Sequence, residues 1–265
     1  METRGALEGL RELVNCRELL WMWTLRGIKV RYKQSLFGFA WAVFQPLALT
    51  AVFALVFSYF VRLPSDGLPY PIFVYSAMLP WSFFSRSVIG GVHSLVGNMD
   101  LVKKIYFPRA VLPTAAIGVH FVDFVCGLVV FLVLMINYGI PPNPAMVMLP
   151  ALLFIQLLLA GGLSLVASAA NVFYRDVNQM APLLLQIWMY ACPIVYPPSL
   201  IPDWLLPWYM LNPMAVLIVA YRNILLKGEW PDLGMVGKAA GLSAAVFALG
   251  YLVFEHLEDR FADAI

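Results

Sequence analysis

The sequence predicts an all-α integral membrane protein with six transmembrane helices. Of its 265 residues, 62% are hydrophobic and only 12% are charged, whereas soluble domains have about 25% charged residues. Residues 37–61 contain no charged side chain, and a helix of about 20 apolar residues already crosses the hydrocarbon core of a bilayer. Lys and Arg also gather before this stretch and between alternate apolar segments, as in multi-spanning membrane proteins.

The apolar segments predict spans at about 37–61, 70–93, 112–137, 145–171, 180–197 and 235–256. Of the 17 Lys and Arg residues, 12 then lie on the N-terminal side of the membrane, four lie on the other side, and Arg86 lies within a span. The positive-inside rule places residues 1–36 and 257–265 in the cytoplasm. We therefore expect one membrane domain over residues 1–265, with both termini cytoplasmic.

Residues 9–33 predict a helix that lies along the cytoplasmic interface instead of crossing the membrane. Apolar residues recur there at helical spacing, with charged residues mostly between them, which is typical of an amphipathic interfacial helix. Arg17 falls near the apolar side, so its guanidinium must reach water or an acid. A simple topological anchor before a first span would show the same pattern.

The outer segment 197–232 predicts short re-entrant helices between spans five and six. Its apolar runs are interrupted by Pro202, Pro207 and Pro213, and none is long enough to cross a membrane. Irregular backbone at membrane depth is tolerated where it packs on protein or lines a cavity.

Three ionisable residues, Arg86, His120 and Asp123, lie inside predicted spans. A charge at the bilayer centre costs at least about 2.5–3.5 kcal/mol, so these groups should face protein or water. They could line a polar pathway, or Arg86 and Asp123 could form an ion pair that only fixes the packing of spans two and three. His120 lies three residues before Asp123, on the same helix face.

Aromatic residues are abundant in the first two spans. In most membrane proteins such residues face lipid or the interfaces. The alternative is a channel lined by aromatic faces, on which sugar rings could stack. The candidate channel residues are Trp41, Tyr59, Tyr75, Trp81, Phe83 and Phe84.

Two inner loops, 98–113 (NMDLVKKIYFPRAVLP) and 171–180 (NVFYRDVNQM), combine charged and aromatic residues over a short length. They predict short helices that dock into a groove of a partner. A solvated loop would explain the cations but not the neighbouring aromatics. The candidate docking residues are Lys103, Lys104, Tyr106, Phe107, Pro108, Arg109, Tyr174, Arg175 and Asp176.

Motifs of several enzyme classes are missing from the sequence. It contains no phosphate-binding G-x-x-x-x-G-K-[ST] loop and no H-x-x-x-H zinc pair, and Asp123 is the only acid well inside a span. The three cysteines are too scattered for a metal or disulfide framework. We therefore expect no enzyme activity, metal or cofactor in this chain alone, and its net charge of +2 gives no reason to expect a nucleic-acid partner.

Several stretches together resemble the transmembrane (permease) subunit of ABC-2-type polysaccharide exporters. They are RYKQSLFG at 31–38 followed by Trp41 and Pro46, YFPR at 106–109, NVFYRDV at 171–177, CPIVY at 192–196, and Asn212-Pro213 with Tyr221-Arg222. The stretch at 171–177 is the most specific of these. Cys192 stands where family members more often have a small residue such as serine.

The resemblance implies a half-transporter that works as a homodimer in the bacterial plasma (inner) membrane. Its substrate would be a polyprenyl-diphosphate-linked glycan, such as the O-antigen of lipopolysaccharide, a capsule polymer or a teichoic acid, which leaves through a channel at the dimer interface. Two copies of a separate cytoplasmic ATPase would hold ATP and Mg and would contact the two inner loops.

The resemblance also implies that the helix near Tyr32 gates the substrate entrance. The cations Arg26, Lys29, Arg31 and Lys33 would hold the diphosphate there, since basic residues near a membrane surface each contribute about 1 kcal/mol to such binding.

Two other classes of function stay open. A drug or small-molecule efflux permease of the same superfamily would bind its substrate in a closed apolar pocket. A membrane scaffold would bind a partner without any nucleotide-dependent change. The aromatic-rich first two spans and the short outer loop at 62–69 favour polymer export.

Overall fold

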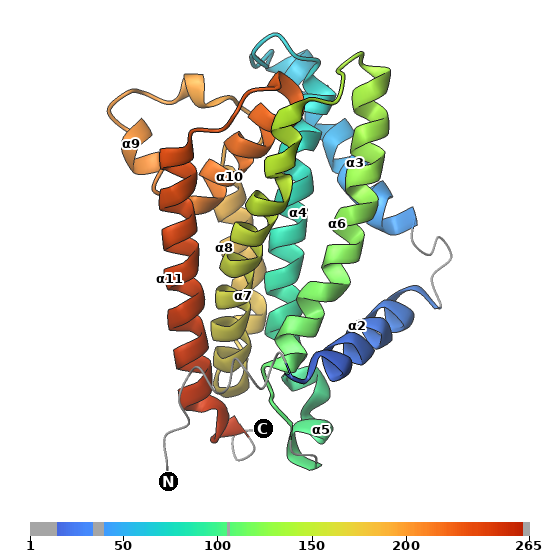
Figure 1. Ribbon diagram of the computed structural model, residues 1–265, viewed down its shortest axis with the longest axis vertical. Coiled ribbons are helices and arrows are strands. Elements are labelled where there is room, and N and C mark those ends of the chain that lie inside the picture. Colours follow the sequence, from blue (N-terminus) through green and yellow to red (C-terminus); the bar gives the residue numbers. More distant parts are fainter. Residues whose placement is uncertain (1–14, 34–39, 105–106, 262–265) are drawn as a thin grey trace.

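The computed structural model describes residues 15–33, 40–104 and 107–261, and this part of the chain is helical, without a strand. The long helices run along a common direction and their connections gather at the two ends of the molecule (Figure 1). Five stretches in the described residues are long and apolar enough to cross a membrane: Val43–Phe60, Tyr70–Ser94, Val111–Asn137, Pro144–Phe173 and Leu233–Glu258. An all-helical fold and five of the six predicted spans are thus confirmed.

The first span consists of α3 (Ala40–Phe53) and a π-helical continuation, Ala54–Phe60. It packs against α4 (Tyr70–Ser94), which lies at the centre of the bundle. In the most apolar stretch of α4, 83% of the residues are buried, because α3, α6, α7, α8 and α10 all contact this helix.

Helix α6 (Val111–Asn137) follows the described part of the first inner loop, and a 3-10 turn (Pro144–Met148) leads into α7 (Leu149–Phe173). Buried polar side chains of α7 hold it to carbonyls of α4. They are Gln156 Nε2 to Pro80 O at 2.6 Å, Ser164 Oγ to Ser87 O at 3.2 Å, and Asn171 Nδ2 to Val92 O at 2.8 Å.

Glycines allow α7 to cross α11 (Leu233–Glu258) with the two backbones in contact. A Cβ atom added at Gly162 would lie 2.5 Å from the carbonyl oxygen of Val246, and one added at Gly250 would collide with the carbonyl oxygen of Gly162. Any larger residue at either position would separate the two helices.

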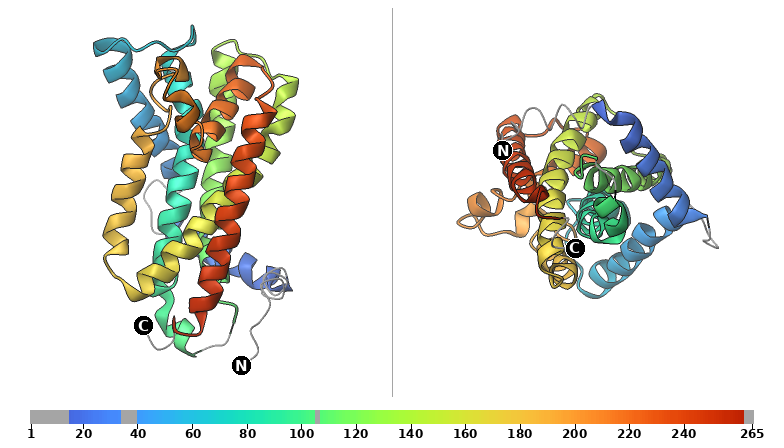
Figure 2. Two further views of the ribbon diagram at one scale, coloured as in Figure 1. Left: turned by 90° about the vertical axis from the view of Figure 1, so that its left-hand side faces the viewer. Right: turned by 90° about the horizontal axis from the view of Figure 1, so that it is seen from below.

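The predicted fifth span is shorter than expected. Helix α8 (Val177–Tyr190) has 14 residues, about 21 Å at 1.5 Å per residue, and ends seven residues before the predicted boundary at 197. Pro193 has no N–H to continue a helix, and the Arg222 guanidinium binds the carbonyls of Pro193 and Ile194 at 2.9 and 3.1 Å. Helix α8 still carries the chain from one end of the bundle toward the other (Figure 2).

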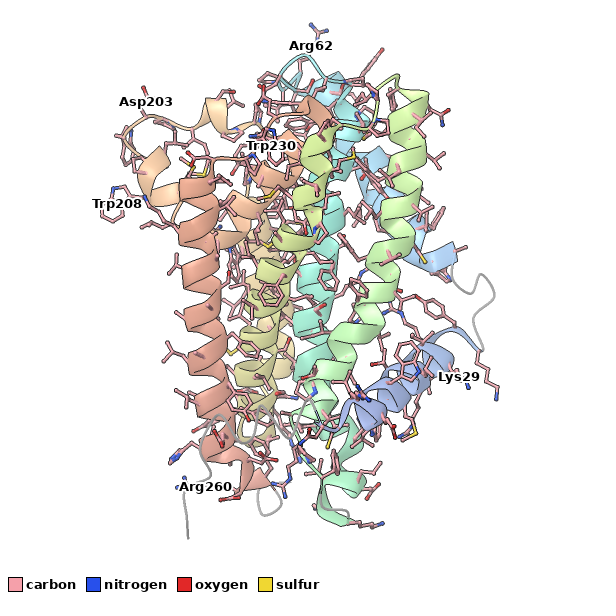
Figure 3. All side chains as sticks on the ribbon, in the orientation of Figure 1. Lys29, Arg62, Asp203, Trp208, Trp230 and Arg260 are labelled. Carbon is pink, nitrogen blue, oxygen red and sulfur yellow. The ribbon has the colours of Figure 1, made fainter. Side chains whose placement is uncertain are left out.

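Short helices follow α8, as predicted, and none of them has spanning length. They are a 3-10 turn (Pro198–Leu200), α9 (Leu206–Tyr209), α10 (Pro213–Arg222) and a π-helical turn (Asn223–Lys227). The Asn212 side chain caps α10 by accepting the N–H of Met214 at 3.1 Å, and α10 packs against α4, α7 and α11. Trp208 in α9 is 71% exposed and points away from the bundle (Figure 3).

At the opposite end lie a 3-10 turn (Val96–Asn98), α5 (Met99–Lys104) and α2 (Arg17–Tyr32). Residues 9–14 of the predicted interfacial helix lie outside the described residues. Helix α2 lies on the outside of the bundle and slopes upward from the lower end of α6 (Figures 1 and 2). Its apolar residues do not form a single stripe, since Trp21, Met22 and Val30 are exposed while Thr24 is buried. The simple two-sided pattern expected from the sequence is therefore not reproduced.

Candidate functional site

Asp123 of α6 is surrounded by polar side chains from three helices, and its own side chain is 5% exposed. Arg31 Nη1 lies 3.1 Å and Arg86 Nη1 lies 3.9 Å from Asp123 Oδ2. The Tyr32 hydroxyl donates a hydrogen bond to Asp123 Oδ1, and His120 lies one turn away on α6. We call these five residues the Asp123 cluster.

The Asp123 cluster lies at membrane depth. Asp123 is twelve residues into α6, about 18 Å along the helix axis, so the slope of α2 is what brings Arg31 and Tyr32 to it. Two guanidinium groups face one carboxylate, which leaves one positive charge in excess. The sequence singled out Arg31 and Tyr32 for a different place, the membrane surface, and did not predict that they meet the intramembrane residues.

The protonation states of the cluster follow from its contacts. Arg31 Nη1 lies 2.9 Å from His120 Nδ1, and a guanidinium can only donate, so Nδ1 accepts and the imidazole is neutral. Burial and the hydrogen bond to Asp123 raise the pKa of Tyr32 above its ordinary value. Its phenol therefore stays protonated and remains a donor to the Asp123 carboxylate.

Two glycines allow α2 to approach α6 closely enough for these contacts. A Cβ atom at Gly27 would lie 2.6 Å from Val119 Cγ2, and one at Gly118 would lie 2.8 Å from Thr24 Oγ1. Neither position was predicted from the sequence. Gly27 lies inside a basic helix that is otherwise regular. Glycine destabilises a helix interior, so its presence there was a signal of close packing against another helix.

A cavity of about 480 Å³ lies between α2, α4 and α6 next to the cluster. Its lining includes two arginines, Arg26 and Arg31, and two histidines, His93 and His120, and we call it the basic pocket. The Arg26 guanidinium lies 4.5 Å from the ring centre of Trp23. Of the predicted gate residues, Arg26 and Arg31 thus line the basic pocket and Tyr32 joins the cluster.

Lys29 and Lys33, the remaining predicted gate residues, are exposed and do not line the basic pocket. Figure 3 shows Lys29 at the outer side of α2, away from the bundle.

The predicted docking residues lie at the same end of the molecule as α2. Lys103 and Lys104 are exposed in α5, which confirms a short helix in loop 98–113, while Tyr106 lies outside the described residues. Arg109 is held by Glu258 of α11, which accepts from the Arg109 backbone N–H at 3.0 Å and from its guanidinium. Phe107 and Pro108, beside it, are partly buried.

The second inner loop is a tight turn, and the predicted docking helix there is wrong. Asn171 and Phe173 belong to the end of α7, and α8 already begins at Val177. Between them only Tyr174, Arg175 and Asp176 project, and all three are exposed.

Most of the predicted channel aromatics are core residues. Tyr75, Trp81, Phe83 and Phe84 are between 0% and 4% exposed, and the Trp188 ring packs against Trp81 and Phe84. These four therefore pack the interior of the protomer and do not face an open channel. Trp41 and Tyr59 are 45% and 79% exposed.

Comparison with known proteins identifies the family of this bundle. Residues 18–226 match the family described as ABC-2 type transporter. The chain belongs to this family. The match includes α2, the Asp123 cluster, both inner loops and the buried Arg222.

Similar proteins include the O-antigen export system permease protein RfbA of Myxococcus xanthus. It is 34% identical over 259 residues, which cover 97% of this chain and 98% of that protein. RfbA of Klebsiella pneumoniae is 27% identical over 252 residues, covering 94% and 95% of the two chains. The polysialic acid transport protein KpsM of Escherichia coli is 21% identical over 211 residues, covering 77% and 80%.

Proposed function

We propose that this chain is the membrane-spanning subunit of an ABC-2 exporter that moves a polysaccharide, such as O-antigen, across the bacterial inner membrane. The observation that carries the proposal is the end-to-end similarity to O-antigen export permeases, which covers 97% of this chain for the Myxococcus xanthus protein. The polysialic acid transport protein among the relatives fits the same substrate class, a long glycan.

The proposed topology has six spans, with both termini in the cytoplasm. Helix α8 and the turn and bends that follow it at 191–196 form the fifth span, and the short helices from 198 to 227 re-enter the outer leaflet. Trp204 and Trp208, which are 73% and 71% exposed, suit the headgroup region. Helix α2 then lies on the cytoplasmic side, rising along the outside of the bundle from the interface to the level of Asp123.

The energy source in this proposal is a separate ATPase, because the chain has no phosphate-binding loop. Two chains would form the transporter, and two ATPase subunits carrying ATP and Mg would bind their cytoplasmic ends. The exposed residues Lys103 and Lys104 of α5 and the turn Tyr174–Asp176 form the contact surface. Arg109 has a positioning role, since its bonds to Glu258 hold the first inner loop against α11.

The basic pocket is the proposed entrance for the diphosphate of a polyprenyl-linked glycan. Arg31 lines this pocket and also pairs with Asp123, so an entering phosphate would compete with Asp123 for the same guanidinium. Arg86 would then remain to compensate the Asp123 carboxylate. In this way substrate binding would release the C-terminal end of α2, which is how the helix acts as a gate.

ATP binding would be transmitted through α4, α6 and α7. The Asp123 cluster joins α2 to α4 and α6, so a rotation of the spans would also move α2. The glycan would then pass between the two copies of the chain. Trp41 and Tyr59, the exposed members of the predicted channel set, are the aromatic side chains on which sugars could stack.

Purification tests the ATPase partnership. The tagged chain is isolated in a mild detergent, and co-eluting ATP hydrolysis is measured for the natural protein and a Tyr174→Ala/Arg175→Ala/Asp176→Ala variant. We expect a stoichiometric ATPase that the variant loses. The control replaces exposed Asp203 and Trp204 with alanine at the opposite end of the molecule and should keep the ATPase. The scaffold function would be favoured if no ATPase co-purified with the chain and none was captured by cross-linking in membranes before purification.

Deleting the gene for the chain tests the substrate class. Surface polysaccharide should disappear while polyprenyl-linked glycan accumulates on the cytoplasmic side of the membrane, and the natural chain should restore export. Unchanged surface glycan together with altered drug sensitivity would instead establish a small-molecule efflux permease.

A further inference from the structure

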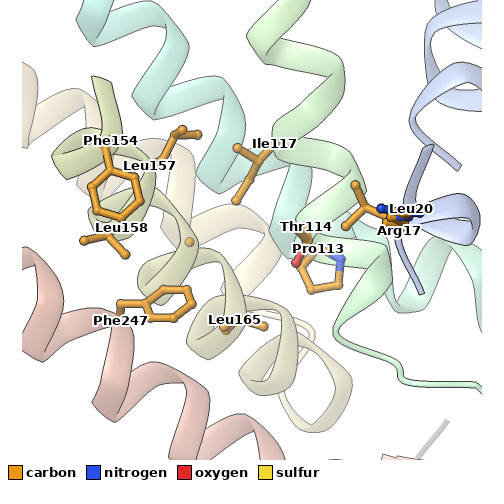
Figure 4. A pocket seen from close by; sticks show the side chains of 11 residues that line it. Arg17, Leu20, Pro113, Thr114, Ile117, Phe154, Leu157, Leu158, Leu165 and Phe247 are labelled. Carbon is orange, nitrogen blue, oxygen red and sulfur yellow. The ribbon is translucent and has the colours of Figure 1, made fainter. Parts of the chain in front are cut away.

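A second hollow is lined by residues of α2, α6, α7 and α11, and Figure 4 shows these residues. Its volume is about 510 Å³, and among the described residues that line it Arg17 alone carries a charge. We propose that this groove binds one anionic phospholipid, with an acyl chain between the helices and the phosphate at Arg17.

The walls of the groove suit a hydrocarbon chain. They include Ile117 of α6, Phe154 and Leu158 of α7, and Phe247 of α11. Water in such a site would lack hydrogen-bond partners, because a stable internal water needs two to four polar contacts. Leu165 and Phe154 line the groove eleven residues apart on α7, about 16 Å along the helix. An elongated apolar slot of that length fits an extended acyl chain better than a compact solute.

The charged end of the groove suits a phosphate. Arg17 is the first residue of α2, its side chain is exposed, and no acidic residue in the described part of the chain forms an ion pair with it. Figure 4 shows Arg17 and Leu20 at the opposite end of the groove from Phe154. Arginine binds phosphate oxygens with paired hydrogen bonds, and basic sites between membrane helices bind anionic lipid headgroups.

The position of Arg17 also identifies the source of the lipid. In the proposed orientation this end of the bundle faces the cytoplasm, so the lipid would come from the inner leaflet. The groove and the basic pocket use opposite ends of α2: Arg17 and Leu20 line the groove, whereas Arg26 and Arg31 line the basic pocket. A bound phospholipid would therefore hold the N-terminal end of α2 against α6 and α7.

The test measures lipid retained by the purified chain. The protein is reconstituted in nanodiscs of phosphatidylethanolamine and phosphatidylglycerol at equal amounts, released into detergent, and weighed by native mass spectrometry. We expect about one phosphatidylglycerol per chain, retained in preference to phosphatidylethanolamine. Arg17→Glu should reduce that retention at least about tenfold, which corresponds to about 1.4 kcal/mol. Arg260→Glu makes the same charge change at an exposed residue just after α11, at the same end of the molecule, and should retain the lipid.

A second variant tests the groove without changing its charge or the residue at position 17. Leu158→Trp fills the groove while keeping Arg17, and it should also reduce retention of phosphatidylglycerol. The proposal would be overturned if the natural chain retained both lipids equally and Arg17→Glu left that retention unchanged. Such a result would indicate only annular lipid. A polyprenyl phosphate retained from cell membranes in place of phospholipid would also overturn it, as would cross-links that place residues 1–14 in the groove.

Discussion

At the scale of single residues, Arg31 links two parts of the proposed mechanism. Its guanidinium lies 3.1 Å from the Asp123 carboxylate and also lines the basic pocket. Removing Arg31 would weaken the attachment of α2 to the cluster and leave the buried Asp123 carboxylate with Arg86, 3.9 Å away. A single substitution therefore cannot separate a structural role of Arg31 from a role in binding the diphosphate.

A charge exchange separates the two roles. Arg31→Asp and Asp123→Arg alone should each abolish export, because each places like charges within the cluster. The double variant restores an ion pair between α2 and α6 but removes the cation from α2. We expect it to recover part of the thermal stability that the single variants lose, because the introduced arginine pairs with the new acid on α2 but lies beside Arg86 and cannot accept from Tyr32. It should not recover export of surface polysaccharide. Full recovery of export would show that Arg31 acts only through Asp123 and would contradict its role in binding the diphosphate.

Ionisable residues in apolar segments were predictable from the sequence, because their insertion cost requires a partner. Arg86 and Asp123 were found in this way, and the structure brings them together. The identity of the other partners was not predictable, since it depends on the slope of α2 and on the close approach at Gly27 and Gly118. Arg222 was counted among the outer cations and belongs to a stretch that carries the family resemblance, but the burial of its side chain was not predicted.

At the scale of helices, length and hydropathy predicted five spans well because these follow from composition alone. The end of α8 was placed too late. Its limit at Tyr190 depends on distant residues: Asn212 accepts from Trp188 Nε1 at 3.1 Å, and Arg222 binds the carbonyls of Pro193 and Ile194. Contacts of this kind, between segments some 20 to 30 residues apart, leave no periodic signal in the sequence.

The crossing of α7 and α11 gives a prediction at this scale. Gly250→Val should destabilise the protein by about 1–3 kcal/mol, the usual cost of forcing extra atoms into a packed contact, because its side chain would meet the backbone of Gly162. Gly241→Val is the matched control on the same helix, since a Cβ atom there has no neighbour within 4 Å. Thermal unfolding in detergent should show a lower midpoint for Gly250→Val only. Equal midpoints for the two variants would mean that the helices can separate at little cost.

At the scale of the whole molecule, α3 and α8 both pack on α4 and both leave large apolar residues exposed. Gln45 of α3 and Gln179 and Gln186 of α8 are exposed as well. An amide that faces hydrocarbon lacks hydrogen-bond partners, which is costly. A second copy of the chain, or water between two copies, would supply those partners, so this face is the proposed dimer interface and channel wall.

Cross-linking in native membranes tests that assembly. Met180, Leu184 and Ile187 lie one after another along the exposed side of α8, and a two-fold axis would bring this side opposite itself in the second copy. Cysteines introduced singly at these positions, in a chain whose own three cysteines are replaced by alanine, should give dimers with a short thiol cross-linker. Leu249→Cys is the control, because Leu249 is 63% exposed on α11, a helix that packs mainly on α7 and α10. Dimers cross-linked at the α8 positions would place the glycan path beside Gln186. Dimers formed only through Leu249→Cys would move the interface to α11 and exclude a channel between the α8 helices.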